Sequence, residues 1–196
     1  LVQGQNLELI TRRQMLPSQP CNFFWVADRI VIDGVIRSDN RGSESVFPLW
    51  VYTGDENGNT TAQRALNFSG PFLAAIEEAT GIPLCGAQRP SAETDQTGRE
   101  LLGYLYGLFH ASTYRERYAA TLCVDFPPVL IPASAALYRR LSQLGCELVN
   151  CHLGHASSGI GPEDQRPGPR WSVSVADPLI AAGFPRWQNE SVYVST

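Results

Sequence analysis

The stretch from Leu101 to Phe109 constrains this chain most, because it predicts a helix with apolar side chains on nearly every side. Seven of its residues are large and apolar or aromatic, namely Leu101, Leu102, Tyr104, Leu105, Tyr106, Leu108 and Phe109. A helix with a single apolar stripe can lie on a surface, whereas one that is apolar all round must be enclosed by other elements. The sequence therefore predicts a central core helix around which the rest of the chain is organised.

The residues after this helix predict a second helix and then an extended segment. Thr113 and Glu116 have the spacing of a capping box, which predicts a new helix from Tyr114 to Leu122. Helical geometry should end at Asp125–Pro128, because proline lacks a backbone donor and restricts the residue before it. The chain is then expected to run extended from Val129 to Pro132.

The first third of the chain predicts β-structure. Apolar and polar residues alternate over residues 6–13, which is typical of a strand with one apolar face. Residues 23–36 are rich in β-branched and aromatic residues around a turn signal, and they predict two short strands. A polar loop over residues 37–45 precedes a third predicted strand from Val46 to Tyr52.

The middle of the chain predicts helices. Apolar spacing indicates a helix from Pro71 to Thr80, with Gly81 at its C-cap position. Residues 82–97 are expected to be irregular, and a further helix is expected from Ser134 to Asn150. Four leucines form the apolar stripe predicted for that last helix, which Gly145 should weaken: Leu137, Leu141, Leu144 and Leu148.

These patterns together predict an α+β fold. A β-rich part over residues 1–66 should pack on a helical part over residues 67–150, within one domain overall. Residues 151–196 hold many Gly, Pro and Ser residues and predict a loop-rich tail. Short strands are expected in that tail at Trp171–Val175 and Ser191–Val194.

Composition narrows the class of protein. A chain of 196 residues with 43% hydrophobic content is long enough to bury a core. It has no apolar run of the roughly 18 residues that predict a membrane span, so we expect no membrane partner. Five irregularly spaced cysteines do not resemble a disulfide framework, and a reducing cytoplasm is the expected setting. Because Leu1 is followed by no secretory leader, we expect a fragment of a longer polypeptide.

Charge is distributed unevenly along the chain. The net charge is -4, which is unusual for a free-standing DNA-binding domain. All 15 basic residues are arginine, which suits bidentate contacts to phosphate or guanine but is equally explained by codon bias. Residues 11–41 hold five Arg against three Asp, and residues 99–140 hold five Arg against three acidic residues. A locally basic face is therefore compatible with the net acidity.

Candidate catalytic and metal-binding residues are few. Cys146, Cys151, His152 and His155 are offset by five, six and nine positions, which do not converge on a tetrahedral metal site along one helix. We expect ordinary thiols and helix-end histidines there, and no metal. His110 has no Ser, Cys and carboxylate at triad spacing, so no catalytic residue is predicted and a stand-alone hydrolase is the least favoured class.

A family resemblance is carried by residues 104–132, YLYGLFHASTYRERYAATLCVDFPPVLIP. This run resembles a signature in the C-terminal target-recognition region of type ISP restriction-modification enzymes, large bacterial proteins that fuse methylation and cleavage in one polypeptide. Phe47 to Tyr52, FPLWVY, resembles a second segment that precedes the signature in that family. The resemblance extends over about residues 6 to 152 and implies the target-recognition domain of an adenine-N6 DNA methyltransferase or a fused restriction-modification enzyme.

The same resemblance implies particular partners. They are duplex DNA and an upstream methyltransferase domain of the same polypeptide, which would bind S-adenosylmethionine. This chain lacks the glycine-rich cofactor motif and the Asn-Pro-Pro-Tyr-type tetrad of such enzymes, so we expect no cofactor within it. Asp125–Pro128 is no such tetrad, because Phe126 separates Asp from the prolines and Val129 replaces the aromatic residue that would stack on a flipped base.

The residue types that read DNA occur after the first predicted strand, in the polar loop and in the signature. The DNA-binding candidates are Arg12, Arg13, Gln14, Arg37, Asp39, Asn40, Arg41 and Arg117. Arg recognises guanine, Asn and Gln recognise adenine, and Asp accepts from cytosine. We expect Arg12, Arg13, Arg37 and Arg41 to lie on one DNA-facing surface.

Alternatives remain open for these residues and for the whole chain. Each candidate could be a solvated loop residue, and Arg115 or Arg117 could be buried or paired internally, since the two point in nearly opposite directions on one helix. The alternative function is a structural or docking domain that packs on the methyltransferase domain without direct base readout.

Overall fold

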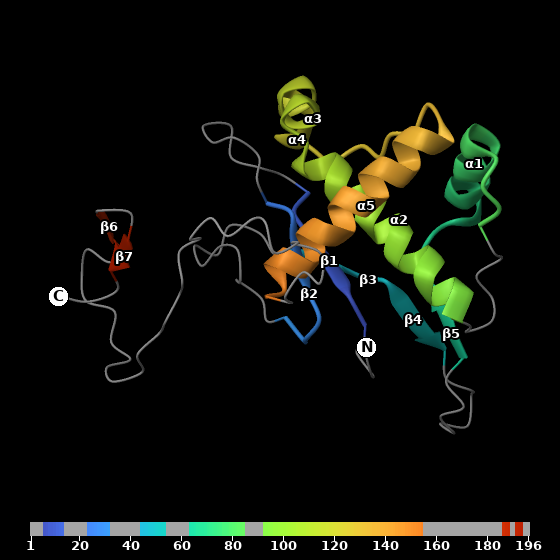
Figure 1. Cartoon of the computed structure of the whole chain (residues 1–196), viewed down its shortest axis with the longest axis horizontal. Helices are drawn as coiled ribbons and strands as arrows, with labels where there is room; N and C mark the ends of the chain where they lie inside the picture. Colours follow the sequence, from blue (N-terminus) through green and yellow to red (C-terminus); the bar gives the residue numbers. More distant parts are fainter. Residues whose placement is uncertain are drawn as a thin grey trace, which may run out of the picture. The chain divides into compact units, whose positions relative to one another are not determined.

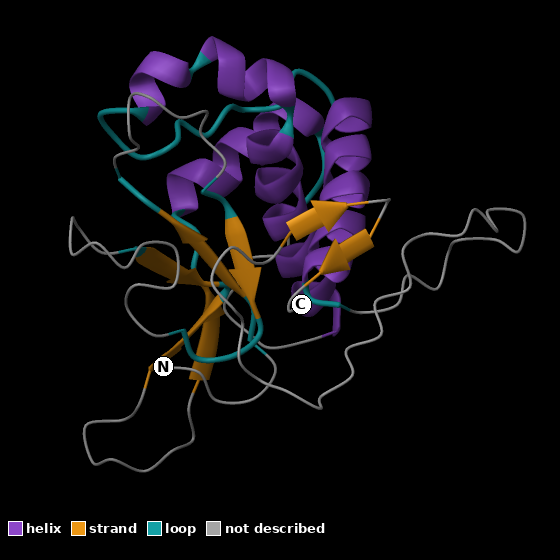
Figure 2. Ribbon diagram, turned by 90° about the vertical axis from the view of Figure 1, so that its left-hand side faces the viewer, coloured by secondary structure: helices purple, strands orange, loops and turns teal. Residues whose placement is uncertain are grey.

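The structure is a computed structural model, and it describes residues 6–13, 23–31, 44–53, 63–84 and 92–154, with two short strands at 186–188 and 191–193. The chain forms two compact units, Leu1–Ser157 and Ser158–Thr196. The first unit contains both strands and helices, which confirms the predicted α+β class. Figure 2 shows its helices gathered on one side of its strands.

A three-stranded antiparallel sheet begins the first unit, in the order β2-β1-β3. Its central strand is β1 (Glu8–Thr11), flanked by β2 (Trp25–Ala27) and β3 (Ser45–Pro48). Leu9 lies opposite both Val26 and Phe47, so these three side chains share one face of the sheet. The predicted strands at 6–13 and within 23–36 are thus confirmed for β1 and β2, whereas a second strand within 23–36 would fall largely outside the described residues.

The single strand predicted from Val46 to Tyr52 is in fact two strands in different sheets. β3 ends at Pro48, and β4 (Trp50–Thr53) pairs with β5 (Gln63–Leu66) in a separate two-stranded sheet. Asn6 explains the change, because its side-chain amide donates to the Trp50 carbonyl (2.9 Å) and accepts from the Trp50 amide (3.0 Å). The buried Asn6 side chain therefore makes the two hydrogen bonds to Trp50 that a neighbouring strand would otherwise make, at the junction between the two sheets.

The first helix, α1 (Gly70–Thr80), forms as its sequence predicts. Ser69 caps its start by accepting from the Phe72 amide, and Gly81 ends it in the left-handed region with φ 64°. An L side chain is strained at that backbone angle, so glycine is the suitable residue there. Ile76 is fully buried and anchors the helix to the core.

The central helix is longer than predicted. α2 (Ala92–His110) begins well inside the stretch expected to be irregular. Gly98 lies in these early turns, and a Cβ at that position would lie 2.6 Å from a methyl group of Leu66. The first turns of α2 thus pack closely on the β4–β5 sheet although they carry few large apolar residues. Arg64 on β5 adds an ion pair to Asp95 on α2 at 2.7 Å.

The helix predicted from Tyr114 to Leu122 is divided into two. α3 (Ser112–Arg117) and α4 (Ala119–Leu122) are separated at Tyr118, whose φ and ψ are -104° and 15°. The predicted capping box is wrong, because α3 begins after Ala111 and no side chain caps it. The helix starts with an ordinary backbone bond, in which the Arg115 amide donates to the Ala111 carbonyl at 3.2 Å.

The last helix of the unit, α5 (Ala135–His152), begins at the Ser134 cap and crosses α2 (Figure 1). The predicted stripe is displaced by one position, because Leu137 and Leu144 are exposed and the buried residues are Tyr138, Ser142, Gly145 and Val149. Gly145 does not weaken this contact but permits it. A Cβ there would collide with the backbone of Gly103 on α2, so the two helices meet backbone to backbone.

The core confirms the enclosed character of α2. Its residues from Leu101 to Phe109 include the fully buried Leu101 and Tyr106, and the large apolar or aromatic residues of that stretch are at most 9% exposed. Strand residues such as Leu9 and Trp50, together with Val149 of α5, complete one cluster around it. Among the described residues, none of the helices is both long and apolar enough to span a bilayer.

The second unit is described only at one antiparallel hairpin. β6 (Arg186–Gln188) pairs with β7 (Ser191–Tyr193), with Trp187 opposite Val192. β7 confirms the strand expected near Ser191–Val194, whereas β6 was not predicted. The strand expected at Trp171–Val175 lies outside the described residues.

Candidate nucleic-acid interface

Two tyrosine hydroxyls hold the segment between α4 and α5, residues 123–134, which we term the proline segment. Tyr104 on α2 donates to the Leu130 carbonyl at 2.6 Å, and Tyr114 on α3 donates to the Pro128 carbonyl at 2.8 Å. Burial raises the pKa of Tyr104 to about 12, so this hydroxyl keeps its proton and remains a donor at neutral pH. The signature tyrosines therefore fix the course of the backbone that follows them.

An exposed ion pair joins the proline segment to the end of β1. Arg13 Nε lies 3.0 Å from Asp125 Oδ1, and the two side chains are 68% and 57% exposed. The pKa of Asp125 is lowered, first because the Phe126 amide donates to the same carboxylate and second because Arg13 does. An exposed pair of this kind stabilises the fold little, and its arginine remains accessible to a ligand.

An apolar pocket, the phenylalanine pocket, lies beside this ion pair and has a volume of about 380 Å³. Its aromatic lining comes from β3, the stretch before α1, α2 and the proline segment: Phe47, Phe68, Phe109 and Phe126. Phe47 and Phe126 meet edge to face with ring centroids 5.7 Å apart, and they are 41% and 38% exposed. Leu9 and Thr11 of β1 line the pocket as well.

The described DNA-binding candidates differ in exposure. Arg12 is 4% exposed, Arg13 is 68% exposed in its side chain, and Arg117 is exposed on α3. Arg12 therefore does not present its side chain to solvent as a groove contact would require, while Arg13 and Arg117 do. The other candidates, Gln14, Arg37, Asp39, Asn40 and Arg41, lie outside the described residues, so their role stays a prediction.

Strand register nevertheless relates two of the candidate segments. Ser45, the first residue of β3, pairs with Thr11, the last residue of β1. The chain before Ser45 therefore joins the sheet at the end where Arg13 leaves it. Arg29, by contrast, follows β2 at the opposite end, because Ala27 pairs with Glu8.

The two signature arginines have different surroundings. Arg115 is half-buried, and its Nε has no hydrogen-bond partner among the described residues, whereas Arg117 is exposed. This difference agrees with the expectation that they point in nearly opposite directions. Arg117 is the member of the pair that a ligand can reach.

A tyrosine and two histidines meet where α2 ends beside the end of α5. The Tyr106 hydroxyl lies 2.6 Å from His152 Nδ1, and His110 Nδ1 lies 2.9 Å from the Tyr106 carbonyl. Burial is the main cause that lowers the pKa of His110, which favours a neutral ring. In the described structure the His110 ring is hydrogen-bonded to the Tyr106 carbonyl and packs against the Tyr106 ring.

Within the described ranges, no group of three His, Cys, Asp or Glu side chains is placed to hold a metal ion. Cys146 is half-buried, whereas Cys151 and His152 are exposed. His155 lies outside the described residues, so the fourth member of the sequence cluster is untested.

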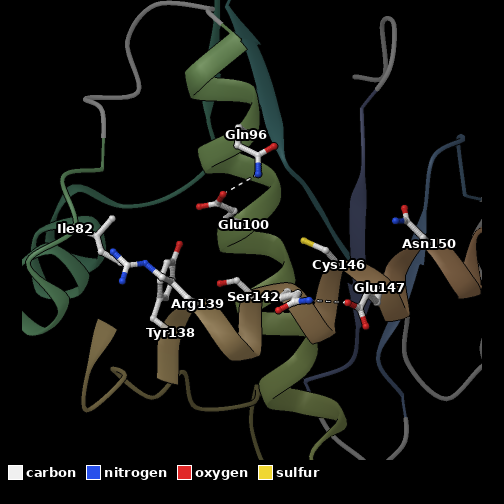
Figure 3. Close-up of a pocket in the computed structure, with 10 residues that line it drawn as sticks. Ile82, Gln96, Glu100, Tyr138, Arg139, Ser142, Cys146, Glu147 and Asn150 are labelled. Carbon is white, nitrogen blue, oxygen red and sulfur yellow. Dashed lines mark hydrogen bonds between the residues drawn. The ribbon is translucent and has the colours of Figure 1, made fainter. Parts of the chain in front are cut away.

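A second hollow of about 450 Å³ lies between α2, α5 and the end of α1 (Figure 3). Glu100 and Glu147 line it, each bonded to a glutamine on its own helix, Gln96 at 2.7 Å and Gln143 at 3.1 Å. Burial raises the pKa of the Cys146 thiol at its edge. Its two carboxylates outnumber its one guanidinium, that of Arg139, so the lining lacks the basic surface that phosphate binding needs.

Sequence reasoning missed the pocket residues Thr11, Phe47 and Phe126. Phe126 was considered only as a departure from a catalytic tetrad, and Phe47 only as part of a matching segment. An aromatic residue between Asp125 and two prolines was the available signal, because a proline-rich extended segment leaves its side chains on a surface.

The comparisons with known proteins agree with this architecture. The chain matches the family described as the type ISP C-terminal specificity domain over residues 1–195. Among solved structures, it is similar to the ATP-dependent type ISP restriction-modification enzyme LlaBIII bound to DNA, with a TM-score of 0.54 and 17% identity over 77% of this chain. It is also similar to the DrdV–DNA complex, with a TM-score of 0.51 and 23% identity over 77% of this chain. No curated protein sequence matches the chain.

The fold and the family match together define a specificity domain of a restriction-modification system. The chain belongs to the type ISP C-terminal specificity domain family. It spans only 8% of the LlaBIII chain and 12% of the DrdV chain, so it corresponds to a small part of each of those proteins.

Proposed function

We propose that this chain is the DNA target-recognition domain of a bacterial adenine-N6 DNA methyltransferase or fused restriction-modification enzyme. In that role it holds duplex DNA and reads base edges, while an upstream methyltransferase domain binds S-adenosylmethionine. The family match over residues 1–195 carries the proposal. The two similar solved structures named above are described as DNA complexes, which supports DNA as the partner. The proposed setting is the cytoplasm, on the ground of the irregularly spaced cysteines alone.

The exposed end of the first sheet supports a DNA contact. Arg13 stands there with most of its side chain accessible, and its only described ion-pair partner is an equally exposed carboxylate. A phosphate oxygen can replace Asp125 at small cost, because the exchange substitutes one anion for another in water. Arg117 provides a second accessible guanidinium on α3.

Duplex binding by the full-length polypeptide tests the proposal. The equilibrium constant for a labelled duplex should fall steeply as salt rises, because phosphate contacts release counterions. One sequence should bind at least about 1000-fold more tightly than scrambled duplexes at physiological salt. Equal affinity for all sequences would refute base readout.

The alternative is a docking domain that packs on the methyltransferase domain without reading bases. Two observations favour it, the burial of Arg12 and the net charge of -4. The same titration separates the two functions when it is repeated on a polypeptide whose specificity domain has been replaced by that of a relative. A docking domain can be replaced in this way without changing the DNA target. If replacing this domain changed the DNA target to that of the relative, the result would support target recognition by the domain.

The methylation chemistry is expected elsewhere in the polypeptide. We expect the isolated chain neither to bind S-adenosylmethionine nor to methylate DNA, because it lacks both sequence motifs named above. Calorimetry of the isolated chain with S-adenosylmethionine should give no stoichiometric heat, and one bound equivalent would contradict this assignment.

A further inference from the structure

One buried hydroxyl in the phenylalanine pocket has no hydrogen-bond partner among the residues that the structure describes. Thr11 is 2% exposed and lines the pocket, yet its Oγ1 makes no hydrogen bond with any described residue. A buried polar atom without a partner destabilises a fold, and such atoms are few in native proteins. The position would be filled more favourably by valine if packing alone mattered. The hydroxyl therefore indicates a ligand that supplies the missing partner.

The shape and lining of the pocket define the class of that ligand. Its volume of about 380 Å³ lies within the range of small-ligand sites. Four of the lining residues are phenylalanines, whose rings pack well against another flat ring. Asn67 adds a polar group, since its Nδ2 donates to the Pro48 carbonyl at 2.9 Å and its Oδ1 can still accept.

We propose that the phenylalanine pocket takes one unstacked base of the bound duplex, an inference that rests on the proposed function. A nucleobase has apolar faces that can pack against the phenylalanine rings and a polar edge that can bond to Thr11. An aliphatic side chain from another domain would fill the same volume but would leave the Thr11 hydroxyl without a hydrogen-bond partner. The polar groups therefore favour a base over a protein segment.

The neighbouring charge supports this choice of ligand. Thr11 is two residues before Arg13, and Phe126 follows Asp125, so the aromatic residues and an exposed guanidinium lie at the same end of the sheet. A base that leaves the stack remains attached to its sugar and phosphate, and the phosphate then needs a cation close to the pocket. Arg13 provides that cation once it exchanges Asp125 for phosphate.

Fluorescent base substitution in the full-length polypeptide tests the proposal. The bound sequence is first defined by selection of bound fragments, and each position is then replaced in turn by 2-aminopurine, which brightens when it unstacks. We expect a position whose fluorescence rises on binding. Removal of the base opposite that position should tighten binding about tenfold, because pairing no longer has to be broken.

Three variants assign the signal to this pocket. Thr11→Val and Phe126→Ala should each reduce the rise at that position at least about threefold, and Phe126→Ala should weaken binding about tenfold or more. Val124→Ala is the matched control, because Val124 is 62% exposed on the same segment but does not line the pocket. It should behave as wild type. Thr11→Val should also melt no lower than wild type, which excludes misfolding as the cause.

Each other result overturns the inference in a recognisable way. A fluorescence rise that persists in Thr11→Val and Phe126→Ala belongs to a different pocket of the polypeptide. Binding could be tight and sequence-specific yet give no rise in 2-aminopurine fluorescence, or no tighter binding when the opposite base is missing. Either result would show that no base enters the pocket, while the proposed function would still hold. If Phe126→Ala then weakens binding to every duplex equally, the pocket holds a protein segment. Absence of binding to any duplex refutes both proposals.

Discussion

The crossing of α2 and α5 and the phenylalanine pocket are built from opposite kinds of contact. At the crossing, Gly103 and Gly145 allow two backbones to meet with no room for a further methyl group. At the pocket, Phe47 and Phe126 stand partly exposed beside a buried hydroxyl with no described partner. The first region is complete without a ligand, whereas the second leaves both apolar surface and a polar atom unsatisfied. Stability and recognition are therefore expected to respond to substitutions in different places.

The largest effect should follow loss of a core ring on α2. Tyr106 is fully buried, so Tyr106→Ala should lower the free energy of unfolding by about 3 to 5 kcal/mol through lost burial and a residual cavity. Denaturant titration of the chain measures this loss. Leu144→Ala is the control, because Leu144 is 42% exposed, and it should cost below about 1 kcal/mol. Similar losses for both variants would mean that α2 is not the centre of the core.

A smaller but still large loss is expected at the crossing itself. Gly145→Ala should lower the free energy of unfolding by about 1 to 3 kcal/mol, because its methyl group forces α5 away from Gly103. Gly70→Ala is the matched control, since a Cβ at Gly70 meets nothing within 4 Å. Thermal melting of the two variants side by side distinguishes them. Equal melting temperatures would show that the helices can separate at no cost.

Removing the Tyr104 hydroxyl, which bonds to the proline segment, should lower stability by an intermediate amount. Tyr104→Phe deletes the donor to the Leu130 carbonyl and should lower the free energy of unfolding by about 0.5 to 1.5 kcal/mol. Hydrogen exchange of the amides near Leu130 should accelerate in the same variant. Unchanged exchange there would show that the tyrosine does not hold the segment.

Substitutions in the exposed ion pair of Arg13 and Asp125 should have the smallest effect on stability. The two substitutions should change DNA binding in opposite directions. Arg13→Ala and Asp125→Asn should leave the melting temperature unchanged, because both side chains are exposed. Arg13→Ala should weaken duplex binding and lower the salt slope by about one unit, whereas Asp125→Asn should tighten binding by freeing Arg13.

The control for the ion-pair variants lies on the same sheet. Arg29→Ala removes an arginine that is 90% exposed in its side chain at the opposite end, and it should bind DNA as wild type does. If Arg29→Ala bound DNA more weakly than Arg13→Ala, the DNA would lie at the end of the sheet near Arg29. That result would contradict our proposal.

The sequence predicted those elements whose signals lie within one short stretch of the chain. The helix through Tyr106 was recognisable because its apolar residues surround it, and the end of α1 was recognisable because Gly81 occupies the position that favours a left-handed residue. Both signals are local. They depend on the residue and its neighbours in the chain rather than on a distant partner.

Elements whose geometry is set by a distant partner were predicted less well. The buried stripe of α5 was misplaced because Ser142 and Gly145 carry little apolar surface, yet their small size is what α2 requires. The division of β3 from β4 depends on Asn6, 44 residues away from Trp50. In the same way, Thr11 became a candidate site residue only once the fold had buried its hydroxyl among aromatic rings.

The tyrosine hydrogen bonds fix the backbone of the proline segment without involving its side chains. Tyr104 and Tyr114 bond to the carbonyl oxygens of Leu130 and Pro128, which every amino acid possesses. Side chains such as Phe126 and Val129 can therefore be exchanged while the backbone keeps its course. A combinatorial library at these positions should yield folded proteins with altered ligand preference, so the segment is a natural starting point for engineering new specificities.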